Sequence, residues 1–166
     1  MFSSTPEVFT AAVLTVSDSS SSGERADLSG PAVVQVLEKQ KFRIVATQVV
    51  PDDRTHIENA LLQLSEKACL VLSTGGTGVA ERDVTPEATR AVCERMVEGV
   101  VERMRLEGAK RTPLAALSRG VCGIRGKCLI LNLPGSPKGA VESLEAVIDI
   151  LPHALRLLAG ETQHDS

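Results

Sequence analysis

Short apolar runs of this chain alternate with segments in which apolar residues recur every three or four positions. The runs contain few polar positions, which is typical of strands buried on both faces of a sheet. A later pair of runs is separated by Arg125-Gly126, a turn that suits the backbone freedom of glycine, and predicts a hairpin over 118–133. The expected strands cover 8–16, 42–50, 68–73, 121–124 and 127–133.

Helices are predicted where the apolar spacing follows the turn of an α-helix. Gly30-Pro31 begins the first, which runs to about Gln40, because proline suits the first helical turn. Thr85 is expected to cap a helix with Pro86 at its first position, and Pro152 should kink or interrupt the last helix. The positions that define these helices are Val33, Val36 and Leu37; Ile57, Leu61 and Leu64; Ala88, Val92 and Met96; a stretch over 97–107; and Val141, Leu144, Ile148, Leu151, Leu155 and Leu158.

Strands that alternate with helices predict an α/β fold, in which helices cover both faces of a mainly parallel sheet. No repeat or linker divides the sequence, so we expect one domain over 9–160, a flexible N-terminus over 1–8 and a flexible tail over 161–166. Because the carboxyl ends of parallel strands meet at one edge of a sheet, the loops that follow the strands should gather into a site. These loops, rich in Gly, Ser and Asp, cover 17–30, 51–54, 73–83 and 132–138.

Composition excludes several classes of partner. The net charge is −3 and only 2% of the residues are aromatic, so the chain lacks both the basic field and the stacking rings of a nucleic-acid-binding module. No signal peptide opens the chain and no apolar run reaches the length of a membrane span. The cysteines form no metal-binding pattern; Cys69 is expected in the core, and Cys122 and Cys128 could face each other across the hairpin, although a disulfide is not expected. We expect a soluble, reduced, cytoplasmic protein with no nucleic-acid or membrane partner.

The glycine-rich segment 74–83 carries the strongest functional signal. It leaves a predicted buried strand, and its glycines at 75, 76 and 78 let the backbone approach a ligand and direct N–H groups at phosphate oxygens. The P-loop pattern is absent, and Glu81 stands where a dinucleotide-binding fingerprint needs a small residue. A backbone cradle for phosphate remains as the prediction.

Two carboxylates are expected near this cradle. Asp83 lies in the glycine segment, and Asp52 follows the second strand. One or two carboxylates suit Mg²⁺ that is bound together with phosphates, and they could also orient a nucleophile. Each has a structural alternative, because a carboxylate at a helix N-terminus opposes the helix dipole.

The remaining polar candidates are weaker. Ser17 and Asp18 end the first strand and are candidate site residues, whereas 20–22 could be a solvated loop. Lys138 could neutralise a phosphate. The histidines of the predicted helices, His56 and His153, are expected to be helix-surface or partly buried residues rather than catalysts.

Seven motifs then occur in a fixed order. They are Val16-Ser17-Asp18, Asp27-x-Ser29-Gly30, Val50-Pro51-Asp52, Thr74-Gly75-Gly76-Thr77-Gly78, Arg82-Asp83-Val84-Thr85-Pro86-Glu87-Ala88, Ala116-Leu117-Ser118-Arg119 and Asn132-Leu133-Pro134-Gly135-Ser136-Pro137-Lys138. With these motifs the chain resembles the molybdenum cofactor biosynthesis proteins of the molybdopterin adenylyltransferase type, which include the G domain of gephyrin. The resemblance covers about residues 9–160.

The resemblance implies a three-layer α/β/α sandwich and a homotrimer. It implies an enzyme that uses Mg-ATP to adenylylate molybdopterin and releases pyrophosphate, the terminal phosphate of molybdopterin attacking the α-phosphate of ATP. Such a reaction needs positioning and charge neutralisation more than covalent chemistry from the protein. Transient contact with other cofactor-biosynthesis proteins is a further implication.

The same resemblance implies roles for individual residues. Asp52 would act on the Mg-ATP side as a magnesium ligand, Asp83 in catalysis or pterin placement, and Ser118 near the pterin. The backbone of Gly75, Gly76, Thr77 and Gly78 would cradle phosphate. The residues expected to line the pterin and phosphate cleft are Ser17, Asp18, Pro134, Gly135, Ser136 and Lys138.

The chain departs from this pattern in one loop. Ser19–Ser22 replace a basic residue that many relatives carry there, and Arg25 could substitute for it. A non-catalytic pterin-binding or carrier protein is therefore a second hypothesis, which the presence of both Asp52 and Asp83 disfavours. A scaffold module is a third, disfavoured by the single domain.

Overall fold

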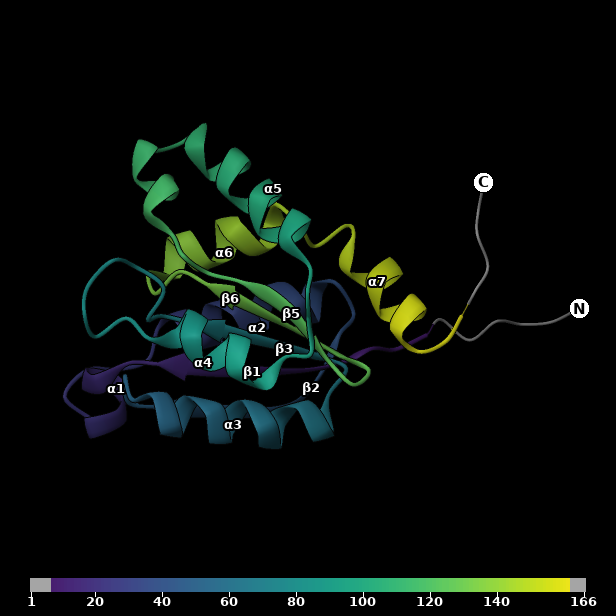
Figure 1. The fold of residues 1–166 in the computed structure, drawn as a ribbon, viewed down its shortest axis with the longest axis horizontal. Coiled ribbons are helices and arrows are strands. Elements are labelled where there is room, and N and C mark those ends of the chain that lie inside the picture. Colours follow the sequence, from purple (N-terminus) through teal and green to yellow (C-terminus); the bar gives the residue numbers. More distant parts are fainter. Residues whose placement is uncertain (1–6, 162–166) are drawn as a thin grey trace, which may run out of the picture.

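A computed structural model describes residues 7–161 of the chain, and every strand in it belongs to one six-stranded sheet in the order β2-β1-β3-β6-β5-β4 (Figure 1). Neighbours among the first four strands run parallel, whereas β5 is antiparallel to both β6 and β4. This confirms a mostly parallel sheet with a hairpin added at one side. The strands are β1 (Thr10–Val16), β2 (Arg43–Val50), β3 (Leu70–Thr74), β4 (Arg95–Met96), β5 (Cys122–Arg125) and β6 (Cys128–Leu133).

Helices cover both faces of the sheet, because successive strand residues point to opposite sides. On β1, Ala11 and Val13 belong to one core and Ala12 and Leu14 to the other. The first core is closed by α2 (Ser29–Lys39), α5 (Glu98–Ala109), α6 (Pro137–Glu145) and α7 (Leu151–Leu158), and the second by α3 (Arg54–Lys67) and α4 (Thr85–Val92). The three-layer sandwich is thus confirmed; in Figure 1, α3 and α6 lie on opposite sides of the sheet.

Some element predictions were wrong in detail. The first part of the expected loop over 17–29 is a short helix, α1 (Asp18–Ser22), which Gly23 ends at φ +82°. Met96 lies on β4 instead of a helix. A short apolar segment, for which no element was predicted, forms a 3₁₀ helix, η1 (Pro113–Leu117). The C-terminal helix is interrupted, as predicted, but the break lies between α6 and α7 and not at Pro152, which sits in the first turn of α7, where a missing N–H costs nothing.

Thr85 does not cap α4. Val84 holds the N-cap position, and Thr85 is the first residue of the helix. The Thr85 hydroxyl instead donates to the carbonyl of Gly75 at 3.0 Å. The threonine therefore anchors the glycine segment to α4, a role that the capping rules do not predict.

The cysteines are all free thiols. In the hairpin, Cys122 lies opposite Leu131 and Cys128 opposite Arg125, so the two cysteines do not face each other. Burial raises the pKa of Cys122 and of Cys128 to about 12. Cys69 is partly buried beside the first core.

We expect these two thiols to resist alkylation, because the thiolate is the reactive form. In the folded protein at pH 8, iodoacetamide should modify Cys122 and Cys128 far more slowly than after unfolding in urea. Peptide mass spectrometry at timed intervals measures both rates. Equal rates in the folded and unfolded chain would contradict the packing described here.

No helix between residues 7 and 161 combines the length and apolar character that crossing a membrane requires.

Candidate active site

Four predicted loops meet at the carboxyl edge of the parallel strands. Ser17 follows β1, Asp52 follows β2, the glycine segment follows β3, and Pro134 follows β6. Two backbone hydrogen bonds join the strand ends, from the Ser17 N–H to the Val50 carbonyl at 2.9 Å and from the Gly75 N–H to the Leu133 carbonyl at 3.1 Å. The structure therefore brings together segments that lie up to 117 residues apart, from Ser17 to Pro134.

The glycine segment takes a path that other residues cannot follow. Gly75 and Gly76 have φ values of +92° and +68°, in the left-handed region that favours glycine. A Cβ on Gly75 would collide with the Val16 carbonyl oxygen, and a Cβ on Gly76 with the Thr85 hydroxyl. Gly135 packs against this turn, since its own Cβ would lie 3.3 Å from the Gly75 Cα.

Three N–H groups of this segment are available to a ligand. The Gly75 N–H is used by Leu133, but those of Gly76, Thr77 and Gly78 have no acceptor among residues 7–161. Successive free N–H groups next to a positive-φ turn are typical of anion-binding backbone. The predicted phosphate cradle therefore has the donors that it needs.

The Asp83 side chain is fixed by its own loop. Its Oδ2 accepts from the Ala80 N–H at 3.1 Å, and its N–H donates to the Ala80 carbonyl at 2.9 Å. The space that a Gly78 side chain would need is taken by Asp83 Oδ2, 2.8 Å from the ideal Cβ position. The carboxylate thus lies next to the glycine segment and does not cap α4.

Asp18 and Asp52 form a reciprocal pair between two loops. The Asp18 N–H donates to Asp52 Oδ2 at 3.1 Å, and the Asp52 N–H donates to Asp18 Oδ1 at 2.9 Å. Asp18 also pairs with the guanidinium of Arg82. The N-cap of α3 is Asp53, which accepts from the His56 N–H at 3.0 Å. Asp52 therefore does not cap this helix.

Burial raises the pKa of the Asp52 carboxyl, and the charges of Asp18 and Asp83 add to the rise, while the hydrogen bond from Asp18 opposes it. A carboxylate that is partly desolvated and repelled by two others gains from a cation. The described residues contain no cluster of three or more His, Cys, Asp or Glu side chains that could hold a metal. One or two carboxylates are enough for Mg²⁺ when substrate phosphates supply other ligands, so Asp52 fits this ion.

We expect Asp52→Asn to stabilise the ligand-free protein at neutral pH. The raised pKa means that ionised Asp52 destabilises the folded state above that pKa, and the penalty is relieved as pH falls through it. The melting temperature of Asp52→Asn should therefore exceed that of the wild type at pH 7, with the difference shrinking toward pH 4. Thermal unfolding across this range tests it; a lower melting temperature of the variant at pH 7 would contradict the assignment.

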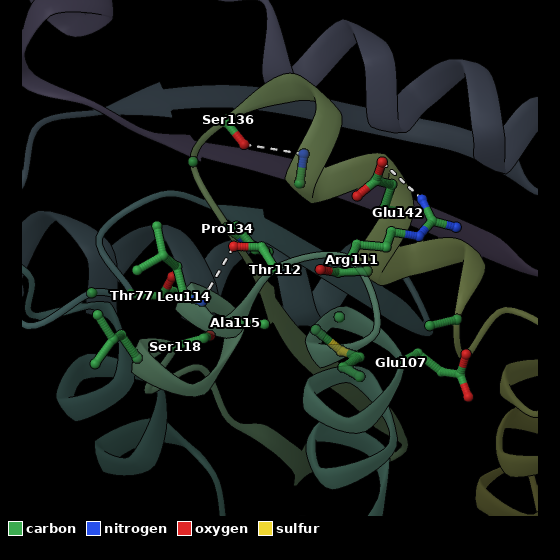
Figure 2. Close-up of a pocket in the computed structure, with 18 of the residues that line it drawn as sticks. Thr77, Glu107, Arg111, Thr112, Leu114, Ala115, Ser118, Pro134, Ser136 and Glu142 are labelled. Atoms are coloured by element: carbon green, nitrogen blue, oxygen red, sulfur yellow. Dashed lines mark hydrogen bonds and ion pairs between the residues drawn. The ribbon is translucent and has the colours of Figure 1, made fainter.

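A cavity of about 680 Å³ opens beside the cradle (Figure 2). Its walls come from the glycine segment, from α6 and the loop before it, and from an arm formed by α5 and η1. Leu114 and Leu117 supply apolar surface on the arm, while Arg111 pairs with Glu142 of α6 at 2.7 Å. Ser118 ends the arm and faces this cavity, as Figure 2 shows.

A second cavity of about 300 Å³ lies on the other side of the cradle. Its polar lining residues include Ser17, Ser20 and Arg25 as well as the carboxylates of Asp27 and Asp52. Three residues line both cavities: Gly76, Asp83 and Gly135. The two cavities therefore meet at the glycine segment and its aspartate.

The sequence-predicted residues divide between these cavities. Gly76, Thr77, Gly78, Asp83, Ser118, Pro134, Gly135 and Ser136 line the larger, and Ser17, Asp52, Gly75, Gly76, Asp83 and Gly135 line the smaller. Asp18 and Lys138 line neither; Asp18 holds Asp52, and the Lys138 ammonium is exposed, 3.9 Å from Glu142. His56 is exposed beside Asp53, and His153 is exposed on α7.

Two features of the site were missed or misplaced by sequence reasoning. The arm contributes Glu107, Arg111 and Leu114, whose pattern reads as an ordinary amphipathic helix and turn. Asn132, predicted both in the strand 127–133 and in the ligand loop 132–138, is buried within β6, where its amide donates to the hydroxyls of Ser73 and Thr89 at 2.9 Å each. The position of Asn132 within an apolar run is the sequence signal that indicates a buried, structural role.

Comparison with known proteins gives the same assignment along the whole fold. The family described as a probable molybdopterin binding domain matches residues 12–153. A molybdopterin adenylyltransferase from Helicobacter pylori is 45% identical, over 89% of this chain and 86% of the relative, and one from Escherichia coli K12 is 41% identical, over 89% and 84%. The solved structure of the molybdopterin biosynthesis enzyme MoaB from Thermus thermophilus is 52% identical, covers 93% of this chain and 98% of its own, and superposes with a TM-score of 0.86. The resemblance drawn from the seven motifs is therefore confirmed, and the chain belongs to the molybdopterin-binding domain family of molybdenum cofactor biosynthesis.

Proposed function

We propose that this protein is a molybdopterin adenylyltransferase that uses Mg-ATP and releases pyrophosphate. The observation that carries the proposal is the pair of cavities that share Gly76, Asp83 and Gly135. A transfer between two substrates needs adjoining sites with the reacting atoms at the boundary. The names of the similar Helicobacter and Escherichia enzymes support the same reaction.

The residues that line each cavity indicate which substrate binds there. The larger cavity, with Leu114 and Leu117 on one side and Ser118 at its base, suits the flat pterin of molybdopterin. The smaller cavity, with Ser17, Ser20 and Arg25, suits the triphosphate of ATP. Arg25 supplies there the positive charge that the Ser19–Ser22 segment lacks. Of the cradle residues whose N–H groups are unpaired within residues 7–161, Gly76 lines both cavities, and Thr77 and Gly78 line the larger.

The reaction then asks little covalent chemistry of the chain. A phosphate oxygen of molybdopterin forms a bond to the α-phosphorus of ATP, and the bond to the bridging oxygen breaks as pyrophosphate leaves. The nucleophile is already an anion, so the chain has to orient it and stabilise the charge of the transition state. Asp52 would hold Mg²⁺, whose charge would offset that of the phosphates; Asp83 would align the reacting groups.

The deciding experiment incubates the purified protein with molybdopterin, ATP and Mg²⁺ and follows adenylyl-molybdopterin and pyrophosphate. Equal, Mg²⁺-dependent appearance of both products would establish the transferase. Molybdopterin binding without product, in an assay where a known adenylyltransferase is active, would refute the enzyme and support the carrier hypothesis.

We also propose a cytoplasmic homotrimer, as the family resemblance implies. Multi-angle light scattering across a concentration series should give three times the chain mass of 17.6 kDa. A chain that remains monomeric at every concentration would contradict this.

A further inference from the structure

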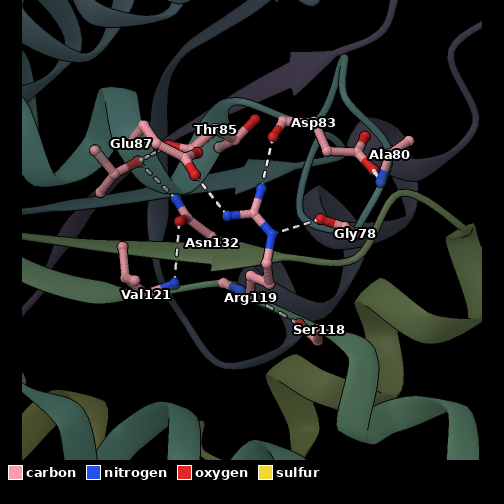
Figure 3. A network of polar contacts seen from close by, with 11 residues as sticks. Gly78, Ala80, Asp83, Thr85, Glu87, Ser118, Arg119, Val121 and Asn132 are labelled. Atoms are coloured by element: carbon pink, nitrogen blue, oxygen red, sulfur yellow. Dashed lines mark hydrogen bonds and ion pairs between the residues drawn. The ribbon is translucent and has the colours of Figure 1, made fainter.

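Arg119 lies immediately after Ser118 and ties the end of the arm to the glycine segment (Figure 3). Its Nε donates to the Gly78 carbonyl at 2.7 Å, and its Nη2 donates to the Asp83 carbonyl at 2.6 Å. Its backbone N–H donates to the Thr77 carbonyl at 2.8 Å. One residue therefore holds both ends of the turn 78–83, and the planar guanidinium fixes the spacing between them.

The remaining nitrogen of the guanidinium, Nη1, binds Glu87. Nη1 of Arg119 donates to Glu87 Oε1 at 2.5 Å, and Oε2 of Glu87 is buried without a hydrogen-bond partner. The hydrogen bond from Arg119 lowers the pKa of the Glu87 carboxyl. Since α4 carries Glu87 and begins just after the turn, the pair also ties the guanidinium to the helix.

Arg119 lines neither of the two substrate cavities. Figure 3 shows its guanidinium among Gly78, Asp83 and Glu87, whereas the Asp83 side chain is directed toward Ala80. Asp83 takes its orientation from the Ala80 N–H within the same turn. The relative placement of Asp83 and Ser118 thus depends on a side chain that contacts neither substrate cavity.

Resting on the proposed function, we infer that Arg119 is a positioning residue for the adenylyl transfer: it holds the turn 78–83 so that the Asp83 carboxylate and Ser118 stay in register across the larger cavity. A lysine cannot replace it, because a single ammonium cannot donate to three divergent acceptors with the geometry of a fork.

The test compares Arg119→Ala and Arg119→Lys with the wild type in adenylyl transfer. We expect kcat to fall about 10²-fold in Arg119→Ala, since a small misplacement of reacting groups costs that much, with KM values for ATP and molybdopterin little changed. The kcat of Arg119→Lys should lie closer to that of the alanine variant than to that of the wild type. Millimolar guanidinium chloride should restore part of the kcat of Arg119→Ala, whereas sodium chloride at equal ionic strength should not.

Hydrogen exchange supplies a readout that does not depend on activity. The amides of Ala80 and Asp83 should exchange faster in Arg119→Ala, while amides of β1 and β3 keep their protection. The matched control is Arg125→Ala, which removes another arginine that donates to a backbone carbonyl, that of Val92 at 3.0 Å, outside both cavities. Arg125→Ala should change neither the exchange rates of the Ala80 and Asp83 amides nor kcat.

Loss of Arg119 alone removes the partner of the partly exposed Glu87 carboxylate, whose Oε2 is already buried without a hydrogen bond, and so lowers stability as well as activity. The double variant Arg119→Gln with Glu87→Gln removes both charges together, and it should show the same loss of kcat with a melting temperature nearer the wild type. Unchanged exchange of Ala80 and Asp83 in a folded variant, or no rescue by guanidinium, would overturn the inference. An inactive wild type would instead refute the proposed function, and the exchange data would still decide whether Arg119 holds the turn.

Discussion

Asp83→Asn is expected to lower the turnover of adenylyl transfer by about 10²-fold or more while molybdopterin and ATP still bind. Asp83 lines both cavities, so under the proposed function its charge would act on both reacting groups. Asparagine keeps the shape and can still accept from the Ala80 N–H, which is 3.1 Å from Asp83 Oδ2. The variant therefore removes the negative charge and keeps the conformation of the loop.

Steady-state kinetics with binding isotherms for each substrate would measure this effect. Glu81→Gln is the matched control, because Glu81 is an exposed carboxylate two residues earlier in the same loop and lines neither cavity. It should behave as the wild type. Turnover of Asp83→Asn at the wild-type rate would remove Asp83 from the catalytic assignment.

Gly76→Ala should damage both stability and phosphate binding. A φ of +68° costs a residue with a Cβ about 1–2 kcal/mol. The added Cβ would also collide with the Thr85 hydroxyl, which cannot retreat because Thr85 is fully buried and its hydroxyl binds the Gly75 carbonyl. Such overpacking adds about 1–3 kcal/mol. We expect a total loss of about 2–5 kcal/mol in the free energy of unfolding.

Gly126→Ala separates these two contributions. Gly126 has a similar φ of +58° in the hairpin turn, and nothing lies within 4 Å of its ideal Cβ position. It should lose only the backbone cost, about 1–2 kcal/mol, and bind ATP normally. Urea unfolding and ATP titrations of both variants test this; equal losses of stability would show that the Thr85 contact carries no energetic weight.

The layout of the strands and of the cradle could be predicted because both depend on local pattern. Apolar runs and helical spacing identify strands that alternate with helices, and in a parallel sheet this is enough to place the loops after β1, β2, β3 and β6 at one edge, although it does not give the strand order. The glycines at 75 and 76 carry their own conformational signal. Reasoning from the residues reached Asp52 and Asp83 as candidates for a metal or nucleophile site, whereas the role of Ser118 came from the family resemblance alone. All three roles stay predictions until they are measured.

The rest of the site depends on contacts between distant segments. The arm of α5 and η1 forms a wall of the larger cavity only because it returns to the sheet at Ser118, and no spacing in the sequence encodes where it returns. Asn132 reads as a loop residue beside Pro134 and Gly135, yet its register opposite Ser73 places it inside the sheet. Thr85 reads as a helix cap, but the nearby Gly75 carbonyl takes its hydroxyl.

The wall shared by the two cavities limits how substrate preference can change. Gly76, Gly135 and Asp83 each face both sides, so a substitution there would alter the Michaelis constants for both substrates at once. Under the proposed assignment of substrates, selectivity for one substrate alone would be adjusted from residues that line a single cavity, such as Leu114 and Leu117 in the larger or Ser20 and Arg25 in the smaller. An engineer who seeks a new nucleotide donor should randomise Ser20 and Arg25 and leave the partition intact.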